Sequence, residues 1–76
     1  MEPKLTEGQH RVGVTFNPSS NPVVDTIKAK AAELIDLMAL YAEDRSHPGA
    51  RCASIAMTEF ESAAMWAVKA VTKQPR

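Results

Sequence analysis

The 76-residue sequence has little cysteine, no excess charge of either sign and no long hydrophobic run. Its single cysteine, Cys52, excludes an internal disulfide and a cysteine-based zinc site, and we expect a reducing, cytoplasmic setting. Nine Lys and Arg residues balance nine Asp and Glu residues, so the cation surplus of a non-specific DNA or RNA coat is missing. No apolar run approaches the roughly 18–20 residues that span a bilayer, and the first residues lack a secretory-signal pattern. We therefore expect neither a membrane nor a nucleic-acid polymer as partner.

Signatures of catalysis and metal binding are missing as well. His10 and His47 lie in segments expected to be irregular, without the helical spacing of a metal site. Glu59 and Glu61 are two residues apart on an expected helix, so they point to different sides and do not share a proton. Cys52 falls on an apolar seam, where a buried thiol is usually inert. We expect a protein that is not an enzyme and that needs no metal and no cofactor.

The composition that remains is that of a globular protein, with 45% hydrophobic and 24% charged residues. A core this small rarely supplies more than a few kcal/mol of stability without a disulfide or a metal. Because the sequence offers neither, association with further copies of the chain is the remaining source of stability. The size of the chain therefore predicts a homo-oligomer.

Two helical patterns follow an irregular N-terminal region, which predicts an all-α fold in a single domain. The predicted segments are an N-terminal arm and turn over 1–21, a first helix over 22–44 and a second helix over 50–73. Within the arm, residues 11–16 alternate between polar and apolar and predict a short extended strand-like piece. The first helix is expected to start after Asn21 as its N-cap, with Pro22 at the first helical position.

A short connection between two helices of similar length predicts an antiparallel hairpin. The expected seams are Val24, Ile27, Ala31, Leu34, Met38 and Tyr41 on the first helix, and Cys52, Ala56, Phe60, Ala63, Ala67 and Ala70 on the second. Two bases and five acids give residues 22–44 a net charge of −3, and five bases and two acids give residues 45–76 a net charge of +3. Further apolar residues of the second helix, Ile55, Met57, Met65, Trp66 and Val68, point to an interface between chains.

Three features allow both a plain and a functional interpretation. Arg51, Thr58, Ser62, Met65 and Lys69 fall along one line of the second helix, continued by Thr72. This line is either a solvated face or a row of phosphate donors. Lys28 borders an apolar face, where it either snorkels to solvent or holds an anion at an inter-chain pocket. Phe16 is either a hydrophobic latch or a platform for a nucleobase.

The order of short motifs resembles the phage anti-CBASS cyclic-nucleotide sponges and the hairpin part of the related Thoeris anti-defence sponge. The motifs are His10-Arg11-Val12, Phe16-Asn17-Pro18-Ser19, Val24-Asp25-x-Ile27-Lys28, Ala31-Ala32-x-Leu34-Ile35-Asp36, Arg51 to Thr58, and Glu61-x-Ala63-Ala64-Met65-Trp66-Ala67-Val68-Lys69-Ala70-Val71-Thr72. The resemblance implies compact hexamers of helical hairpins. It also implies that the protein sequesters cyclic oligonucleotide alarm signals without cleaving them, in the cytoplasm of the infected bacterial host.

The same resemblance assigns residues to two pockets. The cyclic-dinucleotide candidates are Arg11, Phe16, Asn17 and Lys28, and the cyclic-trinucleotide candidates are Met65, Lys69 and Thr72. Lys28 matches the family's phosphate-binding lysine, and Phe16 stands near the aromatic residue that stacks on a base. Lys69 and Thr72 match an Arg/Thr pair, although lysine lacks the bidentate fork of arginine.

Elementary chemistry agrees with such a site and also leaves a rival open. A cyclic dinucleotide needs cations at its phosphates and apolar or aromatic faces for its bases, and a two-fold pocket between chains supplies each element twice. The rival is a structural or adaptor hairpin whose apolar faces serve only protein–protein assembly. Uptake of a cyclic nucleotide separates the two hypotheses.

Overall fold

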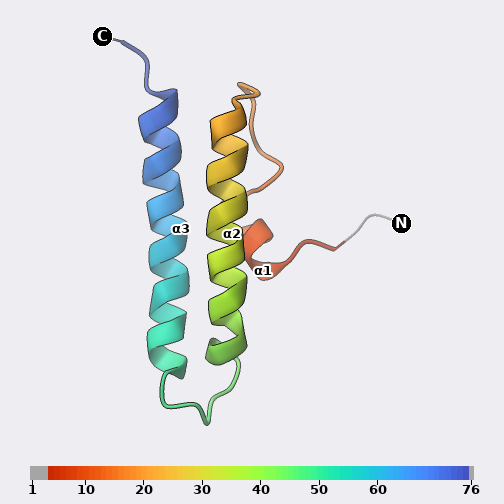
Figure 1. Cartoon of the computed structure of the whole chain (residues 1–76), viewed down its shortest axis with the longest axis vertical. Coiled ribbons are helices and arrows are strands. Elements are labelled where there is room, and N and C mark those ends of the chain that lie inside the picture. Colours follow the sequence, from red (N-terminus) through yellow and green to blue (C-terminus); the bar gives the residue numbers. More distant parts are fainter. Residues whose placement is uncertain (1–3, 76) are drawn as a thin grey trace.

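The structure is a computed structural model that describes residues 4–75. This part of the chain contains three helices and no strand: α1 (Glu7–Val12), α2 (Pro22–Ala42) and α3 (Ala50–Thr72). The two long helices, α2 and α3, lie side by side and run in opposite directions (Figure 1). The predictions of an all-α fold and of an antiparallel hairpin are therefore confirmed.

The prediction of an extended arm over residues 11–16 is wrong, because α1 runs through Val12 and turns follow it. The helix begins with a capping box, in which Thr6 and Gln9 each accept a hydrogen bond from the backbone N–H of the other. It ends at Gly13, whose φ of 64° lies in the left-handed region that glycine adopts without strain. The caps at both ends satisfy free backbone groups, and the short alternation of valines does not outweigh them.

α1 packs closely on α2 because residue 8 is a glycine. A Cβ atom at Gly8 would collide with the backbone carbonyl of Ala32. The close approach lets the N–H of Gly8 donate to Asp36 Oδ1 at 2.7 Å, which places a carboxylate at the positive end of α1. This contact holds the N-terminal end of α1 against α2.

The ends of the long helices follow from their caps. α2 begins at Pro22 as predicted, and the side chain of Asn21 accepts a hydrogen bond from the N–H of Val23 at 2.9 Å. α2 ends two residues before the predicted position 44, and α3 covers 50–72 where 50–73 was predicted. The hairpin turn therefore takes up residues 43–49.

The predicted core seams are displaced around both helices. The buried hydrophobic residues are Val24, Ala31, Ala32 and Ile35 of α2 with Ala53, Met57 and Ala64 of α3. Leu34 and Tyr41, expected in the core, are exposed, and so is Cys52. Met57, expected outside the seam, is buried. The reason is that α2 packs against α1 as well as α3, which shifts its buried face toward Ala32.

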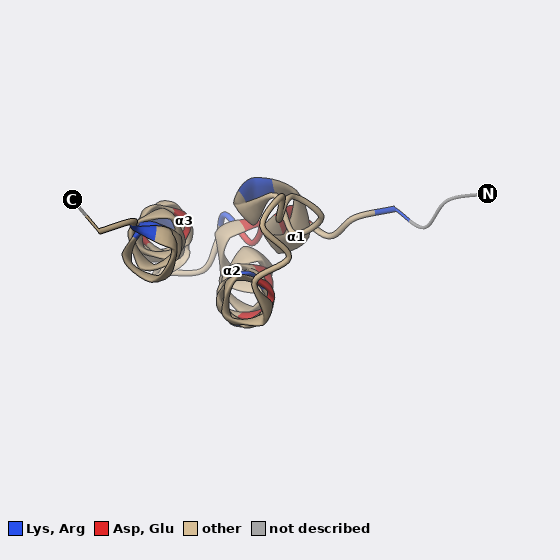
Figure 2. Ribbon diagram, turned by 90° about the horizontal axis from the view of Figure 1, so that it is seen from above, with Lys and Arg blue, Asp and Glu red and all other residues tan. Residues whose placement is uncertain are grey.

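The fold is thin. Its shortest dimension is 12 Å. Figure 2 shows this thin arrangement from above. Large hydrophobic side chains remain exposed on both long helices: Leu34, Leu37, Leu40 and Tyr41 of α2, and Ile55, Met65, Trp66 and Val71 of α3. Assembly with further copies stays a prediction, and these exposed side chains are its structural basis.

Candidate functional site

Lys28 lies in an unusual environment for a lysine, because only 8% of it is exposed. Its ammonium group donates a hydrogen bond to the carbonyl of Gly13 at 2.9 Å and another to the carbonyl of Phe16. Within residues 4–75 the ammonium is thus held by backbone carbonyls and not by a carboxylate. An ammonium has three donors, so one donor remains beyond these two bonds. Lys28 is therefore a largely buried cation on α2, and no carboxylate among residues 4–75 pairs with it.

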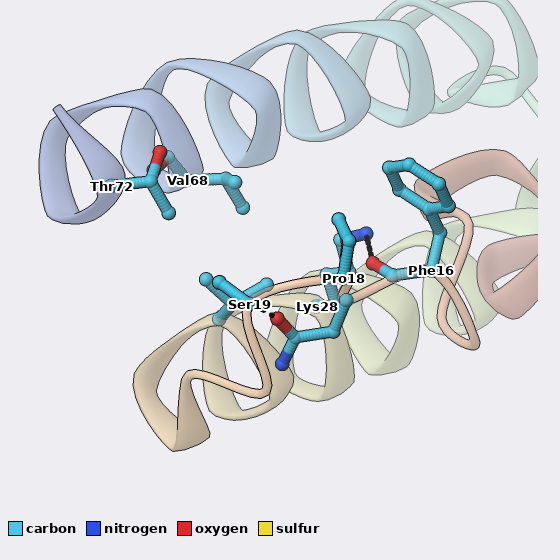
Figure 3. A pocket seen from close by; sticks show the side chains of 8 residues that line it. Phe16, Pro18, Ser19, Lys28, Val68 and Thr72 are labelled. Carbon is cyan, nitrogen blue, oxygen red and sulfur yellow. Dashed lines mark hydrogen bonds between the residues drawn. The ribbon is translucent and has the colours of Figure 1, made fainter.

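A groove of about 290 Å³ opens beside Lys28. Its walls are Phe16, Asn17, Pro18, Ser19, Val24 and Lys28 on one side, and Val68 and Thr72 of α3 on the other (Figure 3). The structure therefore brings three of the four candidates for the dinucleotide site together. Val68, Pro18 and Ser19 were not identified from the sequence, because their part in the groove depends on how α3 faces the turn before α2.

Phe16 has a fixed backbone and a free side chain. Its N–H donates to the carbonyl of Gly13 at 2.9 Å, and its own carbonyl accepts from Lys28. The residue is nevertheless 68% exposed, with the ring centroid 5.4 Å from the ammonium of Lys28. In one protomer the ring is therefore a poor latch, and its face is open to a planar ligand.

The side-chain amide of Asn17 forms its hydrogen bonds with other residues of the same chain. Its Nδ2 group donates to the carbonyl of Asn21 at 2.7 Å and to Asp25 Oδ1 at 2.9 Å. Its Oδ1 atom accepts from the N–H of Asn21 at 3.2 Å and from Ser19 Oγ at 3.3 Å. The four hydrogen-bonding positions of an asparagine amide are thereby occupied. Asn17 organises the turn that leads into α2.

Arg11, the fourth candidate for this site, does not line the groove. Its Nε lies 2.7 Å from Glu7 Oε2 on α1, and its Nη1 lies 3.5 Å from Glu61 Oε1 on α3. Arg11 thus links α1 to α3. Two ion pairs are found within residues 4–75, and neither joins α2 to α3. The opposite net charges of the two helical segments therefore form no ion pair between the long helices in this part of the chain.

The candidates for the trinucleotide site line two different pockets. Met65 and Lys69 line a shallow pocket of about 230 Å³ together with Ser62 and Trp66. The ammonium of Lys69 lies 5.0 Å from the ring of Trp66, a cation–π contact that the spacing of three residues on α3 allows. Thr72 lines the groove beside Lys28 instead, and its hydroxyl donates to the carbonyl of Val68 at 2.7 Å.

The remaining members of the donor row on α3 do not join either pocket. Arg51 lines a separate polar hollow at the hairpin turn together with Arg45 and Ser54. The hydroxyl of Thr58 donates to the carbonyl of Ser54 at 3.5 Å. The row therefore does not form one site within a protomer.

The described residues, 4–75, also bear on metal binding and on membrane insertion. No group of three or more His, Cys, Asp or Glu side chains there is arranged to hold a metal ion. Over the same residues, no helix has the length and apolar character needed to cross a bilayer.

Comparison with known proteins assigns the family. The family model for the Acb2/Tad1 hairpin domain matches residues 7–72, which is most of the chain. The chain belongs to the Acb2/Tad1 hairpin family. No curated protein and no solved structure gives a significant match.

The family is that of the anti-CBASS and anti-Thoeris sponges, which the sequence motifs resemble, so this recognition is confirmed. Membership implies a phage anti-defence protein that binds nucleotide signals. Sponges of this family bind their signals and do not cleave them, which implies a non-enzyme.

Proposed function

We propose that the chain binds cyclic oligonucleotide second messengers and withholds them unaltered, so that bacterial immune signalling stops inside the infected host. Cyclic dinucleotides such as 3′,3′-cGAMP are the first ligand class and cyclic trinucleotides the second. The observation that carries the proposal is the buried ammonium of Lys28, which has no negative partner among residues 4–75 and lies beside an exposed aromatic ring. A buried charge is costly unless it is paired, and a ligand phosphate supplies the missing partner.

The size of the groove supports a site that is shared between chains. Its volume of about 290 Å³ falls just below the range of about 300–1,000 Å³ that is typical of sites for drug-sized ligands. We infer that one protomer holds part of a cyclic dinucleotide and leaves the rest to a second copy. A second copy related by two-fold symmetry supplies the same elements to the other half.

Energetics also favour a doubled site. A charge-assisted hydrogen bond contributes about 1.5–3 kcal/mol, whereas nanomolar binding needs about 12 kcal/mol. One Lys28 does not reach this value. Two copies of Lys28 and two copies of Phe16, with stacking at about 1–3 kcal/mol per base, contribute about 5–12 kcal/mol, and only the upper end of this range reaches nanomolar binding.

The exposed hydrophobic side chains of α2 and α3 support the assembly that this site requires. We propose a compact homo-oligomer, and membership of the family favours a hexamer. In such an assembly Lys69, Met65 and Thr72 of several copies gather around a cyclic trinucleotide. Lys69 and Thr72 line different pockets of one protomer, and a ligand with three phosphates is matched by the same residues of several copies.

Calorimetric titration of the purified chain with 3′,3′-cGAMP and with cyclic tri-AMP tests the proposal. The linear dinucleotide with the same bases is the control for general attraction of phosphate. We expect saturable binding of the cyclic ligands at no more than one ligand per two chains for the dinucleotide. Absence of binding to every cyclic oligonucleotide would refute the proposal.

The same exposed hydrophobic surfaces favour a second candidate function, that of an adaptor whose surfaces bind only protein. An adaptor of this kind assembles equally well with or without nucleotide. Titration therefore separates the two functions, because only the sponge takes up ligand.

A further inference from the structure

Asp25 is an acidic side chain close to a site that is proposed to bind an anion. It lies one helical turn before Lys28 on α2, and its Oδ1 atom is 2.9 Å from Nδ2 of Asn17, which lines the groove. Electrostatic repulsion alone makes an acid at this position unfavourable for binding a phosphate. A carboxylate in the first turn of a helix is favourable for the helix, but that benefit does not require the bond to Asn17.

The contacts of Asn17 explain what Asp25 does there. The amide of Asn17 spends one donor on Asp25 and the other on the carbonyl of Asn21, while its oxygen accepts from Asn21 and Ser19. A hydrogen bond from Asn17 to a base would break one of these internal bonds. Asn17 is therefore suited to fix the backbone of the turn, and Asp25 orients its amide.

The backbone around Phe16 is consequently held on both sides. On one side Lys28 binds the carbonyls of Gly13 and Phe16, and on the other side Asn17 is tied to Asp25. The ring between these two anchors remains exposed. An aromatic ring on a fixed backbone loses little conformational freedom when a base stacks on it.

We propose that Asp25 and Asn17 are positioning residues of the ligand site, which act on the ligand through Phe16. Asp25 holds Asn17, Asn17 holds the turn, and the turn presents the ring beside Lys28. This inference rests on the proposed function, because it assigns roles within the same site. It also replaces the direct ligand contact expected for Asn17 with an indirect one.

Three variants separate positioning from charge. Asp25→Ala removes both the charge and the hydrogen-bond acceptor, whereas Asp25→Asn removes the charge and keeps an oxygen that accepts from Asn17. Glu33→Ala is the matched control, because Glu33 is an exposed acid of α2 that does not line the groove. Affinity for 3′,3′-cGAMP is measured by calorimetry for each variant. Exchange of the backbone amides of Phe16, Ser20 and Asn21 is measured without ligand.

A positioning role and a purely electrostatic role of Asp25 predict opposite effects of Asp25→Ala on the affinity for 3′,3′-cGAMP. Removal of an acid near an anion site strengthens binding if charge alone matters, and Glu33→Ala measures that effect at a distance. We expect Asp25→Ala to bind roughly five- to tenfold more weakly than the wild type, and Asp25→Asn to bind at least as tightly as the wild type. We also expect faster amide exchange at Phe16, Ser20 and Asn21 in Asp25→Ala only.

Failure of this inference is distinguishable from failure of the proposed function. If Asp25→Ala binds as tightly as Glu33→Ala and its amides exchange as in the wild type, the positioning role is refuted and the sponge function stands. If the wild type binds no cyclic oligonucleotide, the sponge function falls, and the exchange rates in the ligand-free protein still decide whether Asp25 orders the turn. A loss of affinity that is equal in Asp25→Ala and Asp25→Asn would also refute the positioning role.

Discussion

Lys28→Met is the substitution that tests the site most sharply, because methionine keeps the length and the apolar stem of lysine and removes the ammonium. In the ligand-free protein the change breaks the two hydrogen bonds to the carbonyls of Gly13 and Phe16. Each bond to a charged group contributes about 1.5–3 kcal/mol, and relief of the burial of a charge offsets part of the loss. We expect the free energy of unfolding to fall by about 1–3 kcal/mol.

The effect of Lys28→Met on ligand binding adds to this loss. Each phosphate contact contributes about 1.5–3 kcal/mol and the proposed site holds two copies of Lys28, so the loss of about 3–6 kcal/mol corresponds to a roughly 150- to 25,000-fold weaker affinity for 3′,3′-cGAMP. The ring of Phe16 also loses the anchor that fixes its backbone. We therefore expect the affinity for 3′,3′-cGAMP to fall by more than the lower bound of this range.

Chemical unfolding at one fixed protein concentration and calorimetric titration measure the two effects. Lys30→Met is the matched control, because Lys30 is an exposed lysine on the same helix and its substitution changes the net charge equally. We expect Lys30→Met to unfold and to bind like the wild type within a small electrostatic difference. Equal stability and equal affinity of Lys28→Met and Lys30→Met would refute the placement of the anion site at Lys28.

Three further predictions concern other parts of the fold. Gly8→Ala forces a Cβ atom against the carbonyl of Ala32, so we expect α1 to detach from α2 and the free energy of unfolding to fall by about 1–3 kcal/mol. Hydrogen exchange should show a loss of amide protection in residues 7–12, and unchanged protection would contradict the close packing. Trp66→Glu places a charge on the exposed apolar face of α3, and light scattering should report a smaller particle than for the wild type. An unchanged particle mass would show that Trp66 does not contribute to an interface between chains. Hydrogen bonds from Ser46 hold the pKa of Asp44 below its ordinary value of 3.8, so their stabilisation is present above that value and is lost as the pH falls through the lowered pKa. Ser46→Ala removes the hydroxyl and keeps the backbone N–H, so it should raise the pKa of Asp44 part of the way toward 3.8 in a titration followed by NMR, and no change would show that the hydroxyl is not a cause.

The long helices and their first residues were predictable because local signals agree. Asn21 and Pro22 mark the start of α2, and the structure uses both as expected. The sequence analysis did not predict α1, although Thr6 and Gln9 form a capping box at its start. A helix of six residues has too few turns to show an apolar period. The core was only partly predictable, since α1 covers Ala32 and moves the buried face of α2.

The sequence and its family resemblance singled out Phe16 and Lys28, and the structure brings both to one groove, while their part in ligand binding stays a prediction. Nothing in the sequence indicated that the ammonium binds the carbonyls of Gly13 and Phe16. Those bonds join residues from different elements, and they depend on the path of the turn before α2. That Thr72 lines the groove beside Lys28 and Lys69 does not likewise depends on which face of α3 packs against α2.

Recovery of ligand from the saturated protein tests most directly whether the chain sequesters its signal unaltered. The protein is loaded with 3′,3′-cGAMP, freed of unbound nucleotide, heated until it denatures, and the released material is identified by mass. We expect the cyclic dinucleotide to be returned intact and in the amount that was bound. Release of a linear dinucleotide, or of no nucleotide at all, would contradict it.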